Sequence, residues 1–168
     1  MGTTLMGKIS NKIVDLDYAS ACVIEWRLNQ ACSIAFTYGC FDLLHEGHKH
    51  MLYNASYYGH KLIVGINTDT SVTRLKGEGR PVQPLSVRAY EIASLPFVDL
   101  VVPFKQKTPY VVVKRLMPDT MIKGGEFRPG ELIGRDYVIN IETIPKIHDI
   151  STSKLIESMG LPNECRSK

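Results

Sequence analysis

Three histidines, His45, His48 and His50, fall within six residues of the segment G-C-F-D-L-L-H-E-G-H-K-H, which begins at Gly39. His45 and His48 are three residues apart, so on a helix they share one face, whereas His50 points about 160° away from His48. No cysteine or carboxylate stands at a spacing that would complete a tetrahedral zinc site, which disfavours a metal cluster. We therefore expect His45 and His48 to act together, His50 to be structural or exposed, and no side chain to be a dedicated metal ligand.

The surroundings of the two histidines are typical of a phosphate-binding turn. Gly39 follows a short apolar run at 33–37 and permits a close approach of the backbone to a ligand. Gly47 keeps side-chain bulk out of the space between the histidines. A helix that begins here presents free amides and a dipole that favour an anion. Two imidazoles beside those amides can stabilise charge on phosphate oxygens during transfer. Solvent-exposed histidines at a helix start are the alternative interpretation.

Apolar runs and amphipathic segments alternate along most of the chain, and most of the apolar runs are rich in Val and Ile. This pattern predicts an α/β protein with a Rossmann-like, doubly wound parallel sheet in a single domain. The expected strands are 33–37, 61–66, 100–103, 120–122 and 137–143, and the expected helices are 17–29, 46–58, 86–95, 109–116 and 151–159. In such sheets the ligand lies beyond the carboxyl ends of the strands, where the histidine turn is predicted to be.

Composition and charge narrow the class of protein. The 168 residues are enough for about one domain, which we divide into an N-terminal helical extension at 1–30 and the domain proper at 31–168. The balance of 20 basic and 17 acidic residues is too even to indicate nucleic-acid binding but allows a local basic pocket. No apolar run approaches a membrane span and no signal peptide is evident. Cysteines 22, 32, 40 and 165 show no paired spacing, which indicates reduced thiols in a cytoplasmic protein.

Two further segments carry groups suited to anions. Ser151 and Thr152 precede a predicted helix whose first turn holds Lys154, a cation that opposes the helix dipole unless an anion binds there; a plain N-cap is the alternative. The segment R-L-K-G-E-G-R, 74–80, lies in a stretch at 71–84 that we expect to be a long loop. Its three cations are either phosphate ligands or parts of a solvated basic loop.

Taken in order, these segments resemble the H-x-G-H nucleotidyltransferase superfamily, related to the cytidylyltransferases. The resemblance is greatest to heptose 1-phosphate adenylyltransferases of ADP-heptose synthesis. It is carried by T-Y-G-C-F-D-L-L-H-E-G-H (37–48), L-I-V-G-I-N-T-D (62–69), R-L-K-G-E-G-R-P-V (74–82), I-K-G-G-E-F (122–127) and I-S-T-S (150–153), together with the pair Trp26-Arg27. H-x-G-H alone is moderately specific, whereas the ordered set is strong.

The resemblance implies transfer of AMP from ATP to D-glycero-β-D-manno-heptose 1-phosphate, with in-line attack, release of pyrophosphate and no covalent intermediate. It implies catalytic roles for His45, His48 and Lys76. Nucleotide binding would fall to Gly39, Cys40, Phe41, Asp42, Gly47, Lys123, Gly124, Gly125, Glu126, Ser151, Thr152 and Ser153 as well as to both histidines. Sugar-phosphate binding would fall to Asn67, Asp69, Arg74, Arg80 and Arg88. Mg²⁺ would be held mainly by the phosphates, and the enzyme would be a homodimer without a nucleic-acid or membrane partner.

Several points stay open at this stage. The family more often has Asn where Tyr38 stands and Asp where Glu126 stands, which leaves the sugar and nucleotide preference undecided. Asp42 either orients a backbone amide or a cation or caps the helix, and Gly124-Gly125 is either a base-reading loop or a plain turn. The chain has no room for a fused sugar kinase, so we expect it to be monofunctional. Alternative functions are a cytidylyltransferase that makes CDP-glycerol or a similar alcohol, an FAD synthetase-type adenylyltransferase, and a non-catalytic nucleotide sensor.

Overall fold

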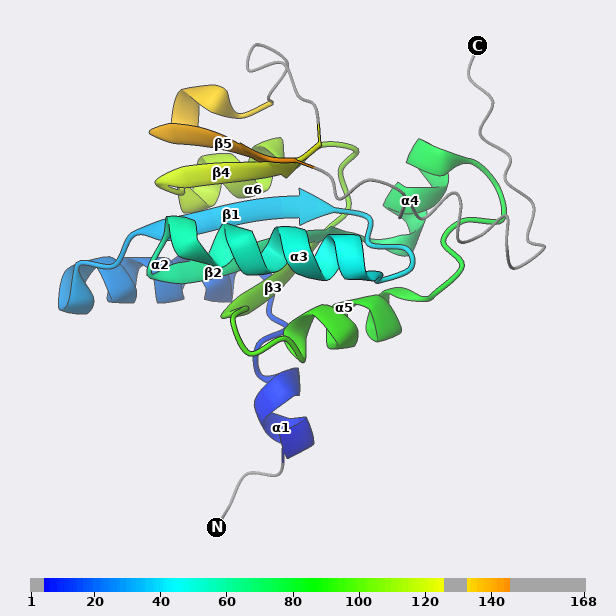
Figure 1. The fold of residues 1–168 in the computed structure, drawn as a ribbon, viewed down its shortest axis with the longest axis horizontal. Helices are drawn as coiled ribbons and strands as arrows, with labels where there is room; N and C mark the ends of the chain where they lie inside the picture. The colour runs from blue at the N-terminus through cyan, green and yellow to red at the C-terminus, as the bar shows by residue number, and fades with distance from the viewer. Residues whose placement is uncertain (1–4, 126–132, 146–168) are drawn as a thin grey trace.

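The computed structural model describes residues 5–125 and 133–145. Five strands form one parallel sheet in the order β3-β2-β1-β4-β5 (Figure 1). They are β1 (Ile34–Gly39), β2 (Lys61–Asn67), β3 (Leu100–Phe104), β4 (Thr120–Gly124) and β5 (Asn140–Ile144). The helices are α1 (Leu5–Ser10), α2 (Leu16–Gln30), α3 (Glu46–Ala55), α4 (Asp69–Lys76), α5 (Leu85–Ala93) and α6 (Tyr110–Leu116), with the 3-10 turns η1 (Ser56–Tyr58) and η3 (Arg135–Tyr137).

The strand order reverses beside β1. From β1 the chain moves outward to β2 and then β3, and it later returns to the other side of β1 to form β4 and β5. The neighbours β1 and β4 are parallel, with Ala35 opposite Thr120 and Phe36 opposite Met121. A reversal of this kind leaves a crevice outside the carboxyl ends of the two strands, where ligands of open α/β sheets bind. The predicted doubly wound fold is therefore confirmed.

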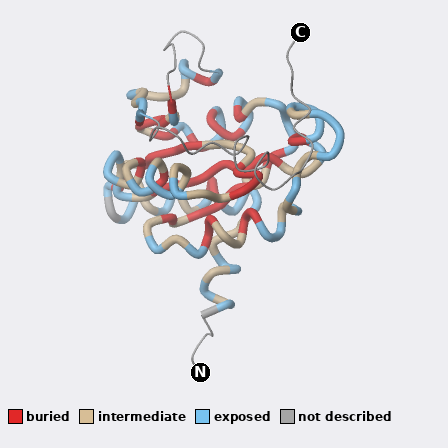
Figure 2. The backbone as a smooth tube through the Cα atoms, turned by 45° about the vertical axis from the view of Figure 1, so that its right-hand side comes forward, coloured by how far each residue is buried: buried red, intermediate tan, exposed pale blue. Residues whose placement is uncertain are grey.

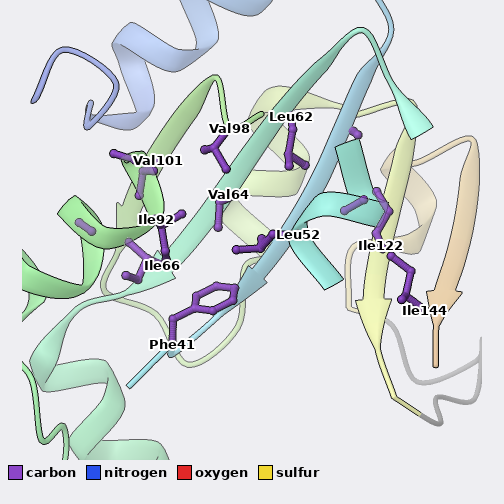
Figure 3. Packing of buried hydrophobic residues seen from close by; sticks show 14 residues of the cluster. Phe41, Leu52, Leu62, Val64, Ile66, Ile92, Val98, Val101, Ile122 and Ile144 are labelled. Atoms are coloured by element: carbon purple, nitrogen blue, oxygen red, sulfur yellow. The ribbon is translucent and has the colours of Figure 1, made fainter. Parts of the chain in front are cut away.

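Two apolar clusters cover the two faces of the sheet. Helices α3 and α5 lie on one face, and α2 and α6 lie on the other (Figure 1). The first cluster joins Leu52 of α3 and Ile92 of α5 to strand residues such as Val64 (Figure 3). The second joins Val23 of α2 and Leu116 of α6 to the opposite face. Strands β1 to β4 contain the long buried runs of the described chain (Figure 2), as expected where a parallel sheet is covered on both sides, whereas the edge strand β5 is mostly exposed or half-buried.

Most predicted elements are confirmed to within a few residues, but the predicted loop 71–84 is wrong in its first part. Helix α4 occupies Asp69–Lys76 and ends at Gly77, which has a φ of 92°. Only Ser71 and Val72 of this helix are buried, so its sequence has too little apolar periodicity to indicate a helix. The predicted strand 137–143 also begins late, because its first residue belongs to η3. The predicted helix 151–159 lies outside the described residues.

The N-terminal segment is joined to the sheet. Beyond α1, which the sequence did not predict, Ile13 forms a parallel bridge with Val101 of the edge strand β3. The amide of Val101 donates to the carbonyl of Lys12 at 2.8 Å, and the amide of Val14 donates to the carbonyl of Val101 at 3.0 Å. Asp15 then caps α2 by accepting from an amide. A boundary at residue 30 stays a prediction. Within the described ranges, no helix has the length and apolarity to span a bilayer.

Candidate active site

The turn after β1 is shaped by a close contact between a glycine and an aromatic ring. A Cβ on Gly39 would lie 3.2 Å from the ring of Phe41, so a larger residue would push against that ring. Phe41 itself has a φ of 46°, an uncommon conformation for a bulky residue. Its buried ring contacts His48 edge-on, with 5.3 Å between the ring centroids. The turn therefore uses a glycine and a strained phenylalanine to bring the backbone of β1 up to the start of α3.

His45 and His48 lie together at the start of α3, as their spacing predicted. Their rings are stacked, with centroids 3.8 Å apart and planes 23° apart. His45 is the N-cap of the helix, and its Nδ1 accepts from the His48 amide at 3.4 Å. His50 is exposed and contacts Asn54 of its own helix, which confirms its predicted place outside the pair.

Burial keeps the histidine pair neutral at pH 7. The pKa of His48 is lowered to about 4, chiefly by burial and then by the neighbouring His45, and Lys76 lowers it further. Burial also lowers the pKa of His45. The Nδ1 of His48 lies 3.1 Å from the carbonyl oxygen of Leu43 and donates a proton to it, which directs Nε2 away from the backbone. Because negative charge stabilises a protonated imidazole, a bound phosphate would favour a proton on Nε2.

Asp42 holds the basic segment against the turn. Its buried carboxylate accepts from Arg80 at 2.6 Å, from the amide of Val82 at 2.7 Å and from the amide of Gln83 at 3.4 Å. The N-cap alternative for Asp42 is wrong, because His45 occupies that position. The other predicted role, orienting an amide and a cation, matches these contacts. The carboxylate of Asp42 thus binds the segment between α4 and α5 to the turn that follows β1.

Arg88 of α5 is the largest fully buried side chain, and it also serves the backbone of the turn. Its guanidinium donates to the carbonyl oxygens of Cys40, Asn67 and Gln83 and to the carboxylate of Asp69, at 2.5 to 3.0 Å. Four of its five N–H groups are therefore used inside the protein. Arg88 thus joins the carboxyl ends of β1 and β2, and its predicted contact with the sugar phosphate stays a prediction.

The predicted sugar-binding residues Asn67, at the end of β2, and Asp69, at the start of α4, differ in exposure. Asn67 is buried, and its side-chain amide donates to Ser71 at 2.9 Å and to the carbonyl of Gln106 at 3.3 Å. Its oxygen accepts from the Cys40 thiol at 3.8 Å. Asp69 pairs with Arg88 but is 45% exposed. The side chain of Asn67 is thus occupied by contacts within the protein, whereas Asp69 keeps an open side, and the predicted sugar contacts of both stay predictions.

Two lysines approach the turn from opposite sides of β1. Lys76 ends α4, and Lys123 lies in β4 with its ammonium 3.8 Å from the centre of the Tyr38 ring. Both act electrostatically on the half-buried thiol of Cys40, whose pKa burial nevertheless raises. Arg74 of α4 is exposed. The sequence marks Tyr38 only as a departure from the family pattern, because the contact partner of a single aromatic residue cannot be read from sequence.

The glycines after β4 form a turn at the crevice. Gly125 has a φ of 92°, and its amide donates to the carbonyl of Ile144 at 2.9 Å. A Cβ on Gly124 would lie 3.2 Å from Met51 of α3, so this glycine allows the helix to pack closely. The glycines thus lie in a turn, and a role of this turn in recognising the base stays a prediction. Glu126, Ser151, Thr152 and Ser153 lie outside the described residues.

The acidic groups of the site do not make a magnesium-binding set. Asp42 and Asp69 are each paired with an arginine, and no group of three His, Cys, Asp or Glu within residues 5–125 and 133–145 is arranged to hold a metal ion. Mg²⁺ usually keeps several waters and binds through one or two carboxylates together with substrate phosphates. Binding of Mg²⁺ through the phosphates of the nucleotide stays a prediction.

The doubly wound parallel sheet, with a glycine turn and a histidine pair beyond β1, is the arrangement that the sequence predicted for a Rossmann-like nucleotidyltransferase. Residues 36–158 match the family model described as cytidylyltransferase-like. Because that match covers most of the chain, the chain belongs to the cytidylyltransferase-like family, and it is a nucleotidyltransferase enzyme. The resemblance inferred from its motifs is thereby confirmed.

Known relatives and structures agree with this assignment. The chain is 45% identical over 126 residues to bifunctional protein HldE of Sulfurimonas denitrificans, which covers 75% of this chain and 26% of the relative. It is 38% identical over 153 residues to bifunctional protein HldE of Wolinella succinogenes, covering 91% of this chain and 32% of the relative. The chain thus spans about a quarter to a third of the length of these relatives.

Among solved structures, the chain is similar to a lipopolysaccharide core biosynthesis protein from Thermoplasma volcanium, with 27% identity and a TM-score of 0.60. That match covers 69% of this chain and 98% of the other. The fold is also shared with a pantoate-beta-alanine ligase from Francisella tularensis, at 15% identity, a TM-score of 0.53, and coverage of 84% of this chain and 68% of the other.

Proposed function

We propose that the chain transfers AMP from ATP to D-glycero-β-D-manno-heptose 1-phosphate, giving ADP-heptose and pyrophosphate. The observation that carries the proposal is the stacked His45–His48 pair at the start of α3, beyond the strand at which the sheet order reverses. The choice of a heptose phosphate is supported by the motif resemblance and by relatives named bifunctional protein HldE. The name of the Thermoplasma structure also points to lipopolysaccharide synthesis.

The proposed chemistry is a single in-line displacement. An oxygen of the sugar phosphate attacks the α-phosphorus of ATP, a new P–O bond forms, and the bond between the α-phosphorus and the bridging oxygen breaks. Pyrophosphate takes the electron pair of the broken bond, so no external base or oxidant is needed. Nε2 of His48, protonated beside the phosphates, donates to an oxygen that gains charge, and Lys76 neutralises charge nearby.

The apo geometry has the right groups for this role. The amides at the start of α3 and the two imidazoles share one end of the helix, where the dipole also favours an anion. Burial around His48 strengthens electrostatic interactions, because the local dielectric is lower than in water. Mg²⁺ supplies charge neutralisation when it accompanies ATP. A homodimer, which rests on the family resemblance, and a cytoplasmic location, which rests on the unpaired spacing of the cysteines, belong to the same proposal.

A substrate grid tests the proposal. Pyrophosphate release is measured with ATP or CTP against heptose 1-phosphate, glycerol 3-phosphate and FMN, each with Mg²⁺. Turnover that requires ATP and the heptose phosphate is expected. Turnover only with CTP and glycerol 3-phosphate, or only with ATP and FMN, would overturn the proposal in favour of another transferase. Nucleotide binding without pyrophosphate release for every acceptor would identify a sensor.

A further inference from the structure

The side chains of Tyr38 and Lys123 form a cation–π pair across the reversal point of the sheet. Tyr38 is near the carboxyl end of β1, and Lys123 holds the corresponding place in the neighbouring strand β4. The ammonium nitrogen of Lys123 lies 3.8 Å from the ring centre, well within the range of a cation–π interaction. Both residues are half-buried, and partial desolvation strengthens such a contact.

The Tyr38 ring is itself held in place. It stacks on the ring of Phe36, with centroids 6.2 Å apart and planes 21° apart. Gly65 of β2 is the register partner of Tyr38, and a Cβ there would lie 2.9 Å from the Phe36 ring and 3.2 Å from the Cβ of Tyr38. The missing side chain at Gly65 thus leaves room for the aromatic pair. The ammonium group of Lys123 therefore lies against a ring whose position is fixed by its neighbours.

The position of Lys123 places it with the other cations of the turn. Lys123 and Lys76 both act electrostatically on the thiol of Cys40, and Lys76 also acts on His48. Lys123 is the next-to-last residue of β4, at the same edge of the sheet as the histidine turn after β1, and Lys76 ends the helix that follows β2. A polyphosphate is the ligand chemistry that several converging cations beside free helix amides recognise.

We propose that Tyr38 is a positioning residue, which fixes Lys123 through its ring so that the ammonium group binds the triphosphate of the nucleotide. The proposal rests on the proposed function for the identity of the reaction but deepens it by one specific contact. The tyrosine hydroxyl is not needed for this role. The aromatic ring alone is sufficient for positioning Lys123, whereas a direct hydrogen bond to the substrate would need the hydroxyl.

Four variants test the role of the ring: Tyr38→Phe, Tyr38→Leu, Lys123→Met and the double variant Tyr38→Leu/Lys123→Met. We expect Tyr38→Leu to raise the KM for ATP and the inhibition constant of pyrophosphate by about 5- to 10-fold, the range of a partly desolvated cation–π contact. The kcat and the KM for the sugar phosphate should change by less than about 2-fold, because no transition-state contact is removed. Tyr38→Phe should behave as wild type, and the double variant should be no worse than Lys123→Met.

A spectroscopic measurement tests the same contact without activity. In the folded protein, the ε-methylene protons of Lys123 should resonate upfield because they lie over the Tyr38 ring, with the signal assigned by its loss in Lys123→Met. The shift should persist in Tyr38→Phe, and its absence in wild type would overturn the proposal. Equal damage from Tyr38→Phe and Tyr38→Leu, or additive effects in the double variant, would also overturn it.

The two proposals fail in different ways. Calorimetric titration with pyrophosphate alone measures the Lys123 contact whichever acceptor the enzyme uses. If the substrate grid fails but Tyr38→Leu still weakens pyrophosphate binding selectively, only the assignment of the reaction is wrong. If the grid succeeds and Tyr38→Leu binds pyrophosphate as wild type does, only the role of Tyr38 is wrong.

Discussion

The histidine pair and the arginine pair of this site contain cationic or potentially cationic groups, yet the fold uses them in opposite ways. His45 and His48 stack on each other at a helix start, and His48 directs one ring nitrogen away from the backbone. Arg80 and Arg88 are held by the carboxylates of Asp42 and Asp69, and Arg88 donates to three carbonyl oxygens as well. The arginines are largely occupied by contacts within the protein, and we expect the histidine pair to face the ligand.

From this difference we predict that Arg88 is less available to a phosphate than the histidine pair is. A buried guanidinium must be paired and hydrogen-bonded by the protein, and those bonds use the donors that a substrate would need. An imidazole can be buried without a counter-ion because it becomes neutral, as the lowered pKa of His48 indicates. The following experiments test this division of roles, from the largest expected effect to the smallest.

Replacing Arg88 should have the largest effect, and it should act on stability. Arg88→Met removes the donor of three carbonyl oxygens and one carboxylate, so the free energy of unfolding should fall by about 3–5 kcal/mol. Urea denaturation measures this loss. Arg74→Met, on the exposed side of α4, is the control and should change stability by less than about 0.5 kcal/mol. A stable Arg88→Met variant with a raised KM for the sugar phosphate would restore Arg88 as a substrate ligand.

His48→Ala should act on catalysis instead. We expect kcat to fall about 100-fold or more, which corresponds to roughly 2.7 kcal/mol of transition-state stabilisation. Steady-state pyrophosphate release measures the loss. His50→Ala, on the same helix but outside the pair, should stay within about 2-fold of wild type. An effect of His48→Ala confined to KM would contradict a role in the transition state.

Asp42→Asn tests the carboxylate that pairs with Arg80. The substitution keeps the shape of the side chain but weakens its bonds to Arg80 and to the amide of Val82, so unfolding should become easier by about 1–3 kcal/mol. Thermal denaturation, with Asp17→Asn as the control, measures the difference. Asp17 pairs with Arg115 at the surface, and its loss should cost less than about 1 kcal/mol. Equal costs for the two variants would show that burial of Asp42 adds nothing.

The pH dependence of stability, measured over a single pH unit, gives the smallest signal. The pKa of His48 is about 4 in the folded protein and near its ordinary value of about 6.5 when unfolded, so the unfolded chain binds the proton first. Stability is therefore lost as pH falls from about 6.5 toward 4, with about 1 kcal/mol lost between pH 6.5 and 5.5. His48→Gln should remove this part of the slope in urea denaturation. An unchanged slope would mean that His48 is not buried in neutral form.

How far the site followed from sequence depends on the residue. The spacing of His45 and His48 predicted a shared face, because the helical period alone decides it. The apolar runs predicted the strands and therefore the edge at which the turn lies. Helix α4 was missed because only two of its residues are buried, a periodicity too weak to separate it from a basic loop.

The contacts of Asp42, Asn67 and Arg88 could not be predicted in this way. Their ion pairs and their contacts with Cys40 join residues that are 19 to 48 positions apart in the chain. The motif resemblance places such residues near the site, but it does not say whether each side chain points inward or outward. That choice follows from the packing of α5 against the sheet and from the burial it imposes.

The sequence by itself thus determined the α/β class, the strand-to-helix turn and the pairing of two histidines, since each of these depends on local period, glycine placement and helix polarity. Only the tertiary structure decided which cations remain for a ligand and which are consumed by the protein, and it alone brought Tyr38 of β1 over Lys123 of β4. The physical reason is that desolvation and long-range hydrogen bonding are properties of the packed chain, and they set the charge and reach of each group in the site.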